Sequence, residues 1–100
     1  MGKLQEKFIR ELVDEQKELL KTIENAEKEI PELEARLKIE KKFLEESKKD
    51  KEIDEDQIQI SIEVLEDMIK MEKEKIENAK RRRQFLVKKA EIVKKPTWSF

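Results

Sequence analysis

Apolar side chains recur at alternating steps of three and four residues in two long stretches of this chain. The first series consists of Ile9, Leu12, Leu19, Ile23, Ala26, Ile30, Leu33, Leu37 and Leu44, with Gln16 and Glu40 in the same register. The second consists of Ile58, Ile62, Leu65, Ile69, Ile76, Ala79, Leu86, Ala90 and Val93, with Glu72 and Arg83 in register. A repeat sustained over this length places one apolar seam along an α-helix, which is typical of a coiled coil. The sequence therefore predicts an all-α fold.

The stretch between the two series, residues 47–56, is polar and lacks the repeat, so the chain is expected to turn there. If it folds back about Lys51, seam positions equidistant from that residue face each other, for example Leu12 and Ala90. We therefore predict a long antiparallel coiled-coil helical hairpin. The same arithmetic predicts charge pairs between the helices, Glu27 with Lys73 and Glu15 with Lys89.

These patterns define the expected boundaries. We predict a single domain over residues 1–95, with a helix at 3–48, a turn at 49–53 and a helix at 54–95. Asp54 is the expected N-cap of the second helix, because its carboxylate can accept from free backbone N–H groups. Pro31 interrupts the first helix without breaking the seam, which predicts a kinked but continuous helix. Residues 96–100 form the expected tail, since Pro96 ends the second helix.

Composition argues against catalysis. The chain has no His and no Cys, which removes the commonest general base, the commonest metal ligand and every thiol. Its single glycine, Gly2, cannot supply a phosphate-binding loop. We therefore predict no enzymatic activity, no cofactor and no metal site.

Charge and hydropathy constrain the setting. Charged residues make up 49% of the chain, yet 24 basic and 25 acidic side chains nearly cancel, so no overall field favours nucleic acid or membrane. No apolar stretch reaches the ~20 residues of a membrane span, and the N-terminal residues lack the apolar segment of a signal peptide. We expect a cytoplasmic protein without a membrane span.

Large apolar residues also occur outside the seam, although a two-helix hairpin needs only its seam. Those nearest the turn are Ile39, Phe43, Ile60, Val64, Met68 and Met71. Such a second stripe favours self-association, so we expect a homodimer in which two hairpins form an elongated four-helix bundle. A foreign protein partner is the alternative occupant. The predicted function is a protein-protein interaction module: a scaffold, adaptor, assembly factor or chaperone-like protein.

The second helix carries a basic run that supports another hypothesis. Its members include Lys80, Arg81, Arg82, Arg83, Lys88 and Lys89. Phosphates bound along this cationic face would make the chain a nucleic-acid-associated protein. The simpler interpretation is a solvated helix end whose cations complement the helix dipole.

The predicted tail contains two aromatic residues, Trp98 and Phe100. On an extended segment they would dock into a partner's pocket. Alternatively, they fold back over Leu4, Phe8 and Ile92 and close the open end of the hairpin.

Overall fold

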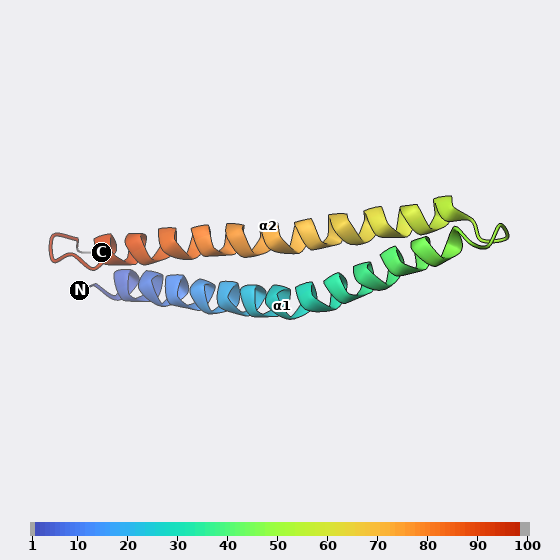
Figure 1. Ribbon diagram of the computed structural model, residues 1–100. Helices are drawn as coiled ribbons and strands as arrows, with labels where there is room; N and C mark the ends of the chain where they lie inside the picture. Colours follow the sequence, from blue (N-terminus) through green and yellow to red (C-terminus); the bar gives the residue numbers. More distant parts are fainter. Residues whose placement is uncertain (1, 99–100) are drawn as a thin grey trace. The chain divides into compact units, whose positions relative to one another are not determined.

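The structure is a computed structural model and describes residues 2–98. Helix α1 spans Lys3–Ser47 and helix α2 spans Glu55–Val93, and no strand occurs among the described residues. The chain reverses between the two helices (Figure 1). The predicted all-α helical hairpin is therefore confirmed.

The tertiary contacts divide the chain into two units. The open-end unit consists of Met1–Asn25 and Lys75–Phe100, and the turn unit consists of Ala26–Glu74. Within each unit, a segment of α1 and a segment of α2 run in opposite directions (Figure 1). Each unit thus has its own share of the seam.

In the turn unit, the core is the predicted seam. Its buried members are Ala26, Leu33, Ile58, Ile62 and Ile69. The remaining seam positions, including polar Glu40 and Glu72, are half-buried. The three-four spacing explains this, because it returns each seam residue to the same side of a 3.6-residue helix.

The open-end unit is built in the same way. Leu86 is fully buried and forms a cluster with buried Leu12 and Ala90, against which Phe8 and Leu19 pack. The predicted facing of Leu12 and Ala90 is thereby confirmed. Every other seam position of this unit is buried or half-buried as well, Gln16 and Arg83 included.

Pro31 lies inside α1 without ending it. Proline has no N–H to donate to the carbonyl of Glu27, four residues earlier. Both residues are exposed, so water can hydrate that carbonyl. The solvent-facing position explains how a proline is accommodated in a continuous helix.

The turn between the helices is held by short-range hydrogen bonds. The backbone N–H of Asp50 donates to the Ser47 carbonyl over 3.0 Å, and that of Glu52 donates to the Asp50 carboxylate over 3.0 Å. The N–H of Asp56 donates to the Asp54 carboxylate over 3.0 Å. Asp54 therefore caps the first turn of α2, as predicted.

Replacing Asp54 by Ala is expected to reduce the free energy of unfolding by about 1 kcal/mol, because one free N–H of the first turn of α2 loses its partner. Asp54→Asn keeps an acceptor oxygen and is expected to reduce the free energy of unfolding by only a small fraction of this amount. Urea unfolding followed by circular dichroism measures both. Equal losses for the two variants would show that the hydrogen bond to the residue-54 side chain does not by itself stabilise α2.

Helix α2 ends two residues earlier than predicted, at Val93 instead of residue 95. Pro96 disfavours helical geometry at the preceding residue, Lys95. A turn follows instead, closed by the Trp98 N–H, which donates to the Lys95 carbonyl over 3.0 Å. This turn redirects the chain immediately after α2.

The observed inter-helix ion pairs differ from the predicted ones. In the turn unit, Lys73 lies 4.0 Å from Glu34, not beside Glu27. Side chains lean toward the N-terminus of their own helix, and in an antiparallel pair this brings Lys73 and Glu34 toward each other. In the open-end unit, Glu15 pairs with Arg82 instead of Lys89.

Neither helix contains an 18-residue segment apolar enough to cross a bilayer, judged over the residues that the structure describes.

Candidate interaction surfaces

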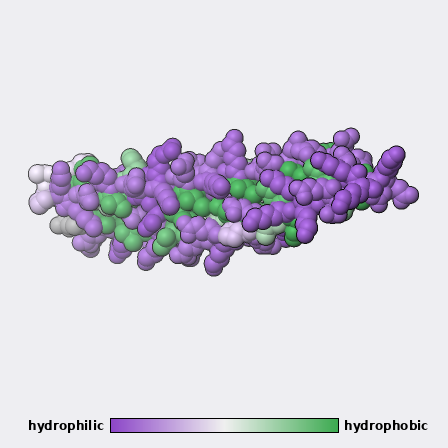
Figure 2. Space-filling view, viewed as in Figure 1, coloured by the Kyte–Doolittle hydropathy of each residue, from purple (hydrophilic) through white to green (hydrophobic). Residues whose placement is uncertain are grey.

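The six apolar residues predicted to lie outside the seam of the turn unit are all exposed. We call them the turn-unit strip: Ile39, Phe43, Ile60, Val64, Met68 and Met71. Their exposed fractions range from 43% for Met68 to 68% for Ile39. Figure 2 shows hydrophobic residues emerging between hydrophilic ones on the face in view. So much exposed apolar surface on one part of a chain makes the strip a candidate contact surface.

Members of this strip from both helices meet in a groove. Ile39 of α1 and Ile60 and Val64 of α2 line a hollow of about 380 Å³. Residues four apart are neighbours on a helix face, so Phe43 extends the strip beyond Ile39, and Met68 extends it beyond Val64. The structure thus brings three predicted residues together and places the others alongside.

The groove has one charge of each sign among its walls. Arg36 and Glu40 both line it. Arg36 is held by an ion pair of 2.9 Å with Glu32, one helical turn earlier.

The basic run of the open-end unit is distributed around α2. Lys80 and Arg81 are exposed, whereas Arg83 occupies a seam position and is half-buried. Lys88 lies 3.8 Å from Glu91. These side chains do not share one face, so the nucleic-acid hypothesis gains no single cationic surface from them.

Arg82 is engaged by an acid of the other helix. Its Nε donates to one carboxylate oxygen of Glu15 over 2.7 Å, and its Nη2 donates to the other over 3.3 Å. This two-point contact suits the planar guanidinium fork, which an ammonium such as that of Lys89 lacks. The hydrogen bond from Arg82 lowers the pKa of Glu15, with a smaller contribution from the charge of Lys89, and it raises the pKa of Arg82.

The lowered pKa of Glu15 predicts a pH dependence. Its stabilising contribution is complete above the ordinary value of 4.5 and is lost as the pH falls through the lower pKa of the folded state. Glu15→Gln is therefore expected to melt at a lower temperature than the wild type at pH 7, and the difference is expected to shrink below pH 4.5.

Thermal melts of wild type and variant between pH 7 and pH 3 provide the measurement. Glu24→Gln, at an exposed position of the same helix, is the control and should track the wild type. A pH-independent difference for Glu15→Gln would contradict the ion-pair account.

Aromatic rings occupy the same face as this ion pair. The Arg82 guanidinium lies 5.1 Å from the centre of the Phe85 ring. The Lys89 ammonium lies 5.1 Å from the Phe8 ring and 5.7 Å from the Phe85 ring. Cations placed over aromatic faces are attracted by the ring quadrupole. Two predicted anion-patch residues, Arg82 and Lys89, are thus occupied by contacts within the unit.

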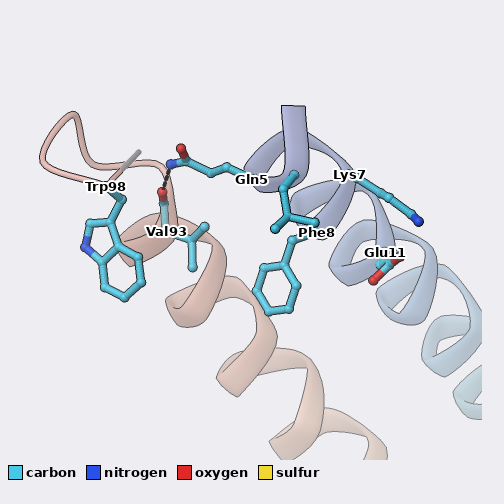
Figure 3. A pocket seen from close by; sticks show the side chains of 7 residues that line it. Gln5, Lys7, Phe8, Glu11, Val93 and Trp98 are labelled. Atoms are coloured by element: carbon cyan, nitrogen blue, oxygen red, sulfur yellow. Dashed lines mark hydrogen bonds between the residues drawn. The ribbon is translucent and has the colours of Figure 1, made fainter. Parts of the chain in front are cut away.

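A pocket lies where α1 begins and α2 ends, and we call it the open-end pocket. It has a volume of about 340 Å³, and Leu4, Gln5, Lys7, Phe8, Glu11, Val93 and Trp98 line it. Figure 3 shows Gln5 reaching from α1 to the backbone of Val93, with the Trp98 and Phe8 rings on either side of Val93. The pocket is predominantly apolar, with two opposite charges at its edge.

Gln5 joins the ends of the two helices. Its side chain is only 3% exposed, and its Nε2 donates to the Val93 carbonyl. Val93 is the last residue of α2, so this carbonyl has no partner within the helix. Gln5 was not predicted as a functional residue, although it continues the seam toward the N-terminus: it lies four residues before Ile9, which lies three residues before Leu12.

The tail residue Trp98 is 41% exposed, and its position in the pocket wall brings it close to Leu4 and Phe8. For Trp98 this arrangement agrees with the fold-back alternative at Leu4 and Phe8, whereas Ile92 is not among the residues that line the pocket. The other tail residue, Phe100, lies outside the described residues.

Among residues 2–98, no group of three or more acidic side chains is placed to hold a metal ion. The comparisons with known proteins identify no relative. No family model matches the chain, and neither a curated protein nor a solved structure does. Any functional proposal must therefore come from the surfaces themselves.

Proposed function

We propose that this chain is a non-enzymatic protein-protein interaction module, and that its turn-unit strip pairs with the strip of a second copy to form a four-helix bundle. The observation that supports this most directly is the groove in which Ile39, Ile60 and Val64 converge from both helices. Burial of apolar area drives association, and a strip formed by two helices offers a pairing surface to two more.

The rim charges favour a second copy as the occupant. Arg36 and Glu40 lie on the same groove. Under two-fold symmetry each groove faces an identical one, so the cation of one copy can approach the carboxylate of the other. A surface with one charge of each sign is thus complementary to itself. As a dimer, the module would act as a scaffold or adaptor.

Light scattering of the purified chain, coupled to size exclusion, tests this proposal. The expected mass is twice the 12.1 kDa of one chain. A mass of one chain at concentrations of tens of micromolar would contradict self-pairing and would point to a foreign protein as the occupant of the strip.

A further inference from the structure

One residue that lines the open-end pocket, Gln5, has a buried polar atom without a partner. Gln5 is only 3% exposed. Its Nε2 donates to the Val93 carbonyl, whereas its Oε1 is buried and accepts no hydrogen bond among the described residues. Figure 3 shows Oε1 on the side of the amide turned away from Val93. A buried acceptor without a donor is costly, and such atoms usually have a partner.

The side chains that line the pocket around the Gln5 amide are suited to pack against an aromatic ring. Leu4, Phe8, Val93 and Trp98 supply aliphatic and aromatic surface. A volume of about 340 Å³ lies within the range of small-molecule pockets. Apolar walls and a few convergent polar groups are what such sites have in common.

We propose that the open-end pocket binds a small aromatic molecule that carries one O–H or N–H donor, of the phenol or indole type. The ring packs against Phe8, Trp98 and Val93, and the donor bonds to Oε1 of Gln5. Oε1 is buried and turned away from Val93, so binding requires the amide to rotate about its terminal torsion, which is soft, and this rotation moves Nε2 off the Val93 carbonyl. This site is separate from the turn-unit strip and does not depend on self-pairing.

Trp98 makes the proposal testable because it is the only tryptophan in the chain and lines the pocket. The probes are 4-methylphenol and toluene, which share a methyl-bearing ring, while only 4-methylphenol has a donor. Nuclear magnetic resonance follows the Trp98 indole N–H and the Gln5 side-chain amide during titration. We expect saturable shifts of both signals with 4-methylphenol and an affinity about 5-fold higher than that for toluene.

A substitution isolates the role of the amide. Gln5→Met keeps the length of the side chain and removes both polar atoms, so it is expected to abolish the preference for 4-methylphenol. Gln59→Met, at an exposed position, is the matched control and should leave the preference intact.

Equal affinity of the wild type for the two probes would overturn the proposal, because it would show that water or a rearranged amide satisfies Oε1. Absence of saturable shifts would do the same. If Gln5→Met fails to fold, the comparison of the two probes on the wild type still decides the matter.

Discussion

Replacing Leu86 by Ala is expected to lower the free energy of unfolding by about 3 kcal/mol and the thermal midpoint by about 10 °C or more. Leu86 is fully buried and packs with Leu12 and Ala90. Truncation to Ala removes apolar contacts and leaves a cavity between the helices, and both changes destabilise the folded state. Thermal and urea unfolding followed by circular dichroism at 222 nm measure the loss.

The matched control is Leu20→Ala, at a leucine of α1 that is 40% exposed. Removing the same atoms there forms no cavity, so the expected loss is below about 1 kcal/mol. Similar losses at the two positions would mean that the seam does not form the core of the open-end unit.

Replacing Val64 by Lys is expected to convert the proposed dimer into a monomer while the helices persist. Val64 is 50% exposed and lines the turn-unit groove with Ile39 and Ile60. The substitution occurs twice in a symmetric dimer, and each copy places an ammonium where apolar surface would be buried. We expect the dimer dissociation constant to rise about 100-fold or more. Light scattering reports the mass, and circular dichroism reports the helicity.

Val87→Lys is the control for this experiment. Val87 has a similar exposure, 44%, but lies in the open-end unit away from the strip. It introduces the same residue on the same helix and should leave the mass of the dimer unchanged. If the two variants have the same mass, the turn-unit strip is not the pairing surface.

The heptad pattern was sufficient to predict the fold. Every seam position is buried or half-buried, including polar Gln16 and Arg83, because helical periodicity alone decides which side of a helix a residue occupies. The cap at Asp54 was predictable for a similar reason, since it depends only on neighbouring backbone groups.

Contacts made by long side chains were harder to predict. Equal distance from the turn predicted Glu15 beside Lys89, but Arg82 binds Glu15 because its guanidinium can make two hydrogen bonds. Lys89 lies instead near the rings of Phe8 and Phe85. The seam register predicts which backbone positions of the two helices face each other. It does not predict which of several long charged side chains nearby forms the ion pair.

The open-end pocket could not be predicted from the sequence, for a different reason. Its walls come from residues near both ends of the chain, and Trp98 reaches them only because a turn at Pro96 redirects the backbone after α2. Gln5 occupies a seam register position, where its polarity alone gave no sign of the bond to Val93. Only the three-dimensional arrangement identifies this amide as part of a pocket.

The fold-back of one chain on itself can be measured directly by the distance between spin labels at Asp14 and Lys88. Both positions are exposed, and the chain has no cysteine, so two introduced cysteines carry the only labels. Double electron-electron resonance, with labelled chains diluted into unlabelled ones, reports distances within single molecules. Packed helix axes lie about 10 Å apart, so we expect a narrow distribution below about 30 Å once the label arms are included. A single uninterrupted helix would separate the labels by about 110 Å, and loss of the short distance on dilution would contradict the hairpin.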